Sequence, residues 1–202
     1  MLDNGKLTDD EFFGDIYHPT NLGHKLMSDC LINLFDKIDQ EEKSITDIII
    51  PKKPKIGASF LNVKMLHSRS DNKDIKIIKG SFSDVDILMP KLAYEDNQDI
   101  FPLNWKHTKE SGHQSFIIKL KCKNFLLSYK KNNNPETAGA IDINIDGVKT
   151  ETIDSYDENG WNNSVTVVLF NESVSKNHEI EIKMAKGSEN KEFTIFTLGY
   201  TE

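Results

Sequence analysis

One segment near the N-terminus has the hydrophobic spacing of an amphipathic helix. Its apolar residues recur at steps of three and four, at Leu22, Leu26, Met27, Cys30, Leu31, Leu34, Phe35 and Ile38. This spacing keeps them on one face of a helix. Thr20 is the expected N-cap, because its hydroxyl can accept from the free amides of the first turn. Pro19 and Gly23 fit a tight loop that enters the helix.

The pattern changes after the Pro51–Pro54 stretch, where short runs rich in β-formers replace the helical stripe. The runs that we expect to be strands cover residues 58–66, 75–78, 114–120, 125–130, 140–145, 164–170, 178–184 and 193–200. Several alternate between apolar and polar residues, and Asp146-Gly147 closes one of them as a hairpin signal. Strands in this number, separated by loops, predict a β-sandwich or jelly roll. The fold class is therefore mainly β, with one helix in front.

The two patterns divide the chain into unlike pieces. Residues 1–42 would form a loop and helix, residues 43–54 a linker, and residues 55–202 the sandwich. The last piece has a normal domain size. An exposed apolar stripe on an isolated helix favours association. We therefore expect the helix either to dock on the sandwich or to form a homodimer with a second copy, and the sequence leaves both open.

Composition excludes several classes of protein. The chain has 202 residues, of which 37% are hydrophobic and 28% charged, which is ordinary for a globular protein. Its net charge of −7 is spread along the chain without a basic stripe, which argues against nucleic acid as a partner. Apolar runs such as Ile48–Ile50 are far too short to span a membrane.

We expect no metal and no cofactor. The two cysteines, Cys30 and Cys122, are too few for a disulfide framework and lack metal-ligand spacing. The histidines outside the candidate catalytic motif are scattered and form no metal triad. Asp84 and Asp86 alternate on a strand or turn, which suits a solvated strand face, with calcium as the alternative. Residues 1–13 do not read as a secretory signal, so the compartment stays unknown if Met1 begins a fragment.

The most informative stretch for chemistry is Gly14–His24. Asp15 and His18 lie three residues apart in a loop that runs directly into the capped helix. A histidine so placed can take a proton from a hydroxyl nucleophile, while the carboxylate holds its other ring nitrogen in the useful tautomer. An Asp-x-x-His spacing also arises by chance, and an incidental histidine in a helix-entry loop is the alternative.

The full stretch, Asp-x-x-His-Pro followed by Thr20-Asn21, Gly23 and a long striped helix, resembles the last conserved block of the SGNH (GDSL-type) hydrolases. The likeness covers roughly residues 10–38. In that family this block closes an α/β/α domain and completes a Ser-His-Asp triad. The resemblance implies that Asp15 is the orienting carboxylate and His18 the general base, while His24 would be structural.

The family's other blocks are missing from the chain. The family carries its nucleophile in a Gly-Asp-Ser block and its oxyanion-hole Gly and Asn in middle blocks, all upstream of Asp-x-x-His. Here Gly14-Asp15 is followed by Ile16, and Ser59, Ser81 and Ser115 have no such context. Without a nucleophile or oxyanion donors the base has nothing to activate. We therefore expect a C-terminal fragment of an esterase that is not competent alone.

The order of landmarks in the β-region also resembles a family. It is similar to the jelly-roll modules attached to SGNH-type carbohydrate esterases and to galactose-binding-like sandwiches. Trp105 and Trp161, with Tyr94 and Tyr156, are candidates for a platform that stacks on a sugar ring. The alternative is that the tryptophans fill the sandwich.

The sequence thus supports three functional hypotheses. The first is an esterase fragment that in the intact enzyme hydrolyses acyl esters, plausibly the O-acetyl esters of carbohydrates. The parent protein would then be bacterial and secreted or on the cell surface. The second is a carbohydrate-binding or interaction module without a catalytic role. The third is a structural sandwich that supports another subunit.

Overall fold

The computed structural model describes residues 6–15, 17–40, 57–88 and 100–202. The chain divides into two compact units, Met1–Lys52 and Lys53–Glu202. The linker expected at residues 43–54 lies outside the described residues. Among the described residues, no helix combines the length and the apolar character needed to cross a bilayer.

The described residues of unit 1 form the helices α1 (Asp9–Phe12) and α2 (Asn21–Gln40). The second confirms the helix predicted from the apolar stripe, and its start at Asn21 confirms Thr20 as the N-cap, since the Thr20 hydroxyl accepts from the Gly23 N–H at 3.1 Å. The short α1 begins with a capping box in which Thr8 and Glu11 bond reciprocally. Along α2, all of which is described, only Gly23 is buried.

Unit 2 is an antiparallel β-sandwich. Its strands are β1 (Lys64–Leu66), β2 (Lys76–Ile78), β3 (Trp105–His107), β4 (Phe116–Asn132), β5 (Ala140–Ile145), β6 (Val148–Asp154), β7 (Trp161–Met184) and β8 (Phe193–Thr201). This confirms the predicted fold class.

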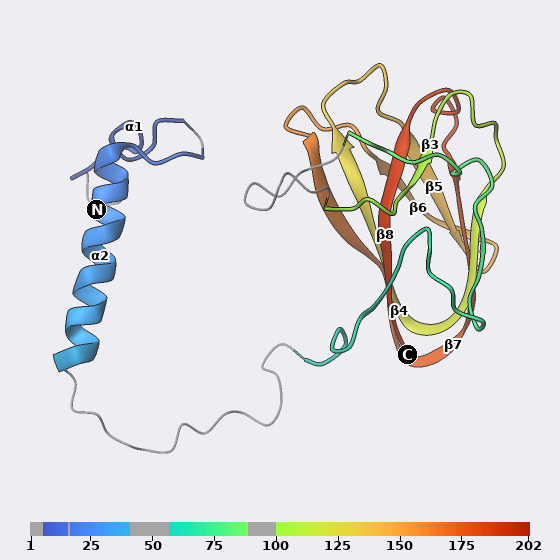
Figure 1. The fold of residues 1–202 in the computed structure, drawn as a ribbon, viewed down its shortest axis with the longest axis horizontal. Helices are drawn as coiled ribbons and strands as arrows, with labels where there is room; N and C mark the ends of the chain where they lie inside the picture. Colours follow the sequence, from blue (N-terminus) through green and yellow to red (C-terminus); the bar gives the residue numbers. More distant parts are fainter. Residues whose placement is uncertain (1–5, 16, 41–56, 89–99) are drawn as a thin grey trace. The chain divides into compact units, whose positions relative to one another are not determined.

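The two long strands β4 and β7 take part in both layers of the sandwich, and they curve from one to the other (Figure 1). Residues 116–122 of β4 pair with β2 and with residues 176–182 of β7. Residues 180–184 of β7 pair on their other side with β5, which pairs with β6. Residues 124–132 of β4 pair with residues 161–171 of β7 and with β8, which also holds β1 and β3. A register shift between Cys122 and Asn124 marks the place where the layers separate.

The expected strands were partly wrong in their bounds, although eight were expected and eight are found in the described residues. The runs 114–120 and 125–130 belong to the single strand β4, and 164–170 and 178–184 belong to β7. The polar residues between these runs stay in the ladder because the strands bend there instead of ending. Two strands were not predicted, the short β3 and the mostly exposed β6, whose residues show little apolar alternation.

The core lies between the two layers and uses the inward face of each strand. The largest fully buried side chains include Phe116, Ile118, Leu127, Ile143, Ile180 and Ile182. The predicted alternation of residues 178–184 is confirmed, since Ile180 and Ile182 are buried and Glu179 is exposed. This core fixes the strands that carry the candidate binding residues Trp105 and Trp161.

Candidate functional site

The structure joins Asp15 and His18 directly. The Nδ1 atom of His18 lies 2.7 Å from Oδ2 of Asp15. The other carboxylate oxygen, Oδ1, accepts the backbone N–H of Tyr17 at 2.7 Å and that of His18 at 2.8 Å. Both oxygens are therefore engaged, and a carboxylate held this way fixes the orientation of the imidazole.

The electrostatics of the pair suit a base and its orienting anion. The hydrogen bond from His18, assisted by the N–H groups of Tyr17 and His18, lowers the pKa of Asp15 to about 2. Asp15 is thus ionised at neutral pH and accepts a proton-bearing Nδ1. The Nε2 atom of His18 then carries the lone pair, and the His18 side chain is 79% exposed, so a reacting hydroxyl can reach it.

The loop that carries the pair is closed at its base. The Gly14 N–H donates to the His18 carbonyl at 2.7 Å, and Phe13 and Pro19 form an antiparallel bridge. A small hollow lined by Asp9, Asp10, Phe13, Gly14 and Asp15 lies beside it. The residues that precede α2 therefore present the Asp-His pair on a short, bonded loop.

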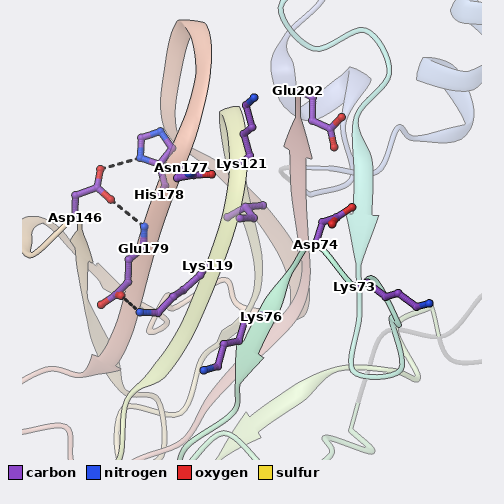
Figure 2. A pocket seen from close by; sticks show the side chains of 11 residues that line it. Lys73, Asp74, Lys76, Lys119, Lys121, Asp146, Asn177, His178, Glu179 and Glu202 are labelled. Atoms are coloured by element: carbon purple, nitrogen blue, oxygen red, sulfur yellow. Dashed lines mark hydrogen bonds and ion pairs between the residues drawn. The ribbon is translucent and has the colours of Figure 1, made fainter.

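A second Asp-His pair, which sequence reasoning missed, lies in the sandwich. Nδ1 of His178 is 2.9 Å from Oδ2 of Asp146, and Oδ1 of Asp146 accepts the Glu179 N–H at 2.9 Å. Figure 2 shows this pair at one side of an open groove of about 830 Å³. Burial alone would raise the pKa of Asp146, but the hydrogen bonds from Glu179 and His178 outweigh it and lower that pKa.

The two Asp-His pairs differ in the solvent exposure of their histidine side chains. The His178 side chain is only 1% exposed and its ring packs 4.4 Å from that of Phe170. A substrate therefore cannot reach it, and the pair acts as a brace between the β5–β6 turn and β7. The only sequence signals were the Asp-Gly turn and the late histidine strand, and nothing in the local spacing joins them.

The groove beside this second pair has a balanced charge. Its lining contains Lys73, Lys76, Lys119 and Lys121 together with Asp74, Asp146, Glu179 and Glu202 (Figure 2). The Glu179 carboxylate forms an ion pair with Lys119, and Glu202 forms one with Lys64. The lining therefore gives the groove no strong preference for an anion or a cation.

The structure places the two candidate tryptophans in opposite environments. Trp105 on β3 is 1% exposed, and its ring meets Phe116 edge-on at 5.3 Å. Its faces are closed to a sugar, so Trp105 fills the sandwich, as the alternative reading held. Trp161 at the start of β7 is 61% exposed.

Trp161 and Tyr156 both lie beside the C-terminal end of strand β4. Both pair with Asn132, Trp161 in the β4–β7 ladder and Tyr156 through an isolated bridge, and the Tyr156 side chain is also exposed. Gly160 permits this close approach, because a Cβ there would lie 2.9 Å from the backbone nitrogen of Asn132. Tyr94 lies outside the described residues. The structure thus leaves Trp161, with Tyr156 near it in the fold, as the candidate sugar platform.

The remaining polar candidates are held in structural contacts. Ser81 donates to the Gln114 carbonyl at 2.7 Å, and Ser115 donates to the Glu181 carboxylate at 2.7 Å. The buried His107 has its two ring nitrogens 2.9 and 3.0 Å from the Lys191 and Gly112 carbonyls. In the part of the chain that the structure describes, no three His, Cys, Asp or Glu residues come together to hold a metal ion.

Comparison with known proteins supports the fold. No protein-family model matches the chain, and no curated protein matches its sequence. A two-domain esterase active on acetylated mannans, co-crystallised with mannopentaose, superposes with a TM-score of 0.64 at 17% identity, covering 100% of this chain and 52% of its own. Another structure of such an esterase gives a TM-score of 0.62 at 19% identity, with 100% and 53% covered.

A family 35 carbohydrate-binding module from an environmental isolate gives a TM-score of 0.44 at 11% identity, covering 69% of this chain and 93% of that module. The chain thus spans about half the length of the two-domain esterases that it resembles in fold. Its structural neighbours are carbohydrate esterases and a carbohydrate-binding module, and at these identities the likeness establishes the fold alone.

Proposed function

We propose that this chain is the C-terminal part of an SGNH-type carbohydrate esterase, in which His18 is the general base and Asp15 orients it. One observation carries the proposal. The 2.7 Å contact between His18 Nδ1 and Asp15 Oδ2 lies on an exposed loop directly before a capped helix. This is the arrangement that a hydrolytic triad needs from its base and its carboxylate.

The proposed reaction is the hydrolysis of an acyl ester. A serine from a part of the enzyme outside this chain attacks the ester carbonyl carbon, and its proton moves to Nε2 of His18. The imidazolium stays bonded to the Asp15 carboxylate and gives the proton to the sugar oxygen as its bond to the acyl carbon breaks, which leaves an acyl-serine. In the second half, His18 takes a proton from water as the water attacks the acyl carbon. The bond between the acyl group and the serine then breaks, and His18 returns the proton to the serine oxygen.

The proposed substrate class is an O-acetylated polysaccharide. Its support is the likeness of the whole chain, helix and sandwich together, to two-domain esterases active on acetylated mannans. The apolar stripe of α2 also fits the proposal. Leu31, Leu34 and Phe35 are exposed in the described structure, and in an SGNH domain this stripe would pack on the sheet.

The test uses both the 202-residue chain and the longest protein that its gene encodes. We expect the chain alone to leave p-nitrophenyl acetate at the background rate, because the nucleophile and oxyanion donors lie elsewhere. In the longer protein, Asp15→Asn should lower kcat by roughly 10⁴-fold and His18→Ala by roughly 10⁶-fold. His24→Ala is the matched control and should keep the activity. A gene that encodes no Gly-Asp-Ser block upstream would overturn the proposal.

A second candidate function is carbohydrate binding by the sandwich without a catalytic role. The observation that favours it is the exposed Trp161, with the exposed Tyr156 joined to the same residue, Asn132. Exposed aromatic faces stack on sugar rings while nearby amides bond the hydroxyls. This function is compatible with the first, because an accessory module of an esterase would bind the polymer that the enzyme deacetylates.

A further inference from the structure

Thr20 bonds to both ends of the loop that carries the Asp-His pair. Its backbone N–H donates to the Phe12 carbonyl at 2.8 Å, and its hydroxyl donates to the Glu11 carbonyl at 2.6 Å. The same hydroxyl accepts the Gly23 N–H at 3.1 Å. One residue therefore ties the last carbonyls of α1 to the first turn of α2.

Gly23 allows α2 to come close enough to α1 for these hydrogen bonds to form. A Cβ at position 23 would lie 2.3 Å from the Phe12 carbonyl oxygen and 3.0 Å from the Cβ of Pro19. Any larger residue must push α1 and the loop away from α2, because the obstructing atom belongs to the backbone. This close approach explains why Gly23 is the buried residue of α2.

We infer that Thr20 and Gly23 are positioning residues for the Asp15–His18 pair, acting by clamping the base of its loop between α1 and α2. The clamp joins Glu11 and Phe12 to Thr20, so the intervening loop has a fixed span. Within that span Asp15 can reach the Tyr17 and His18 N–H groups and the His18 ring together. The inference rests on the proposed function, since it assigns these residues to the same site.

The Thr20 hydroxyl has two separable roles. As an acceptor it caps α2, and as a donor it binds the Glu11 carbonyl. Aspartate is as good an N-cap as threonine but its carboxylate cannot donate to a carbonyl. Thr20→Asp therefore keeps the cap and removes the side-chain bond of the clamp to Glu11, Thr20→Val removes both, and Thr20→Ser keeps both, while the backbone bond to Phe12 remains in all three.

The readout is the tautomer of His18, measured on the 202-residue chain by ¹⁵N NMR of the imidazole at a pH where the ring is neutral. Wild type should hold the proton on Nδ1, facing Asp15. Thr20→Asp, Thr20→Val and Gly23→Ala should each reduce the Nδ1–H fraction at least two-fold. Thr20→Ser should keep the wild-type fraction. Gly14→Ala is the matched control, because the nearest atom to a Cβ there is 3.6 Å away.

Far-UV circular dichroism on the same samples reports whether α2 stays helical. A fall in the Nδ1–H fraction in Thr20→Asp, with the helix retained, supports the clamp. A wild-type tautomer in Thr20→Asp and Gly23→Ala overturns the inference and leaves the proposed function standing. Absence of the Nδ1–H tautomer in the wild-type chain instead removes the observation that carries the proposed function.

Discussion

The ammonium of Lys130 on β4 is paired with the carboxylate of Asp86 inside the sandwich, where the two side chains are only 7% and 1% exposed. Thr194 donates to Oδ2 of Asp86 at 2.6 Å, and the Leu88 N–H donates to Oδ1 at 2.9 Å. The sequence predicts a solvated strand face for Asp86, with a calcium site as the alternative. The solvated-face expectation is wrong for Asp86, and the cation beside this carboxylate in the described structure is a lysine.

Removing the lysine should strongly destabilise unit 2. Lys130→Met leaves a buried carboxylate without its cation, and breaking a buried pair in this way costs about 3–5 kcal/mol. Urea unfolding followed by tryptophan fluorescence measures the loss, and Lys119→Met, at an exposed ion pair, is the control with an expected cost below about 1 kcal/mol. Equal effects of the two substitutions would contradict the burial argument.

The same pair should make stability depend on acid pH. Burial alone would raise the pKa of Asp86, but the hydrogen bonds from Lys130 and Thr194 outweigh it and hold the pKa below its ordinary value. A carboxylate with a lowered folded-state pKa stabilises the fold above its unfolded-state pKa of about 3.9. This contribution is lost as the pH falls through the folded-state pKa. Unfolding free energies measured from pH 6 downward should fall less steeply for Asp86→Asn than for wild type.

The two cysteines should differ in reactivity. Cys30 is exposed on α2, whereas Cys122 is buried in the core, where desolvation raises the pKa of its thiol to about 12. The thiolate is the reactive form, so a disulfide reagent at pH 8 should modify one thiol per native chain. Cys30→Ser should abolish the fast reaction, and denaturant should expose the second thiol. Rapid modification of native Cys30→Ser would contradict the buried position of Cys122.

The apolar stripe of α2 should mediate association of the 202-residue chain as a homodimer, one of the two arrangements that the sequence leaves open. The stripe is exposed in the described structure, and exposed apolar patches favour association. Sedimentation equilibrium should show a dimer that Phe35→Glu converts to monomer. Lys25→Gln lowers the net charge by the same amount on the face of α2 opposite the stripe and should leave the dimer intact. A monomeric wild-type chain at all concentrations would disprove the homodimer.

Carbohydrate binding should depend on Trp161 and not on Val174, although both are exposed on β7. We expect retardation of the chain in affinity gels that contain acetylated mannan, with Trp161→Ala lowering the affinity at least ten-fold, since stacking is removed. Val174→Ala should match wild type. If no polysaccharide retards the wild-type chain, the carbohydrate-binding function fails.

Local spacing was enough to predict the parts of the protein whose partners are close in the chain. The apolar stripe predicted α2, the Asp-Gly turn and alternating residues predicted the sandwich strands, and the three-residue spacing of Asp15 and His18 predicted their contact. Each of these features depends on backbone geometry within a few residues, so the spacing of residues along the sequence is enough to predict it. The sequence did not predict that β4 and β7 are each one continuous strand, because a bulged strand and two separate strands have similar polar interruptions.

Only the tertiary structure decided which residues are accessible and which distant residues meet. Nothing in the local sequence distinguishes Trp105 from Trp161. Packing against Phe116 buries Trp105, whereas Trp161 is exposed at the start of its strand. Likewise, Asp86 meets Lys130, and Asp146 meets His178, only because strands from different parts of the chain are neighbours. Burial then separates the two Asp-His pairs, since an exposed imidazole can exchange a proton with a substrate and a buried one only braces the fold.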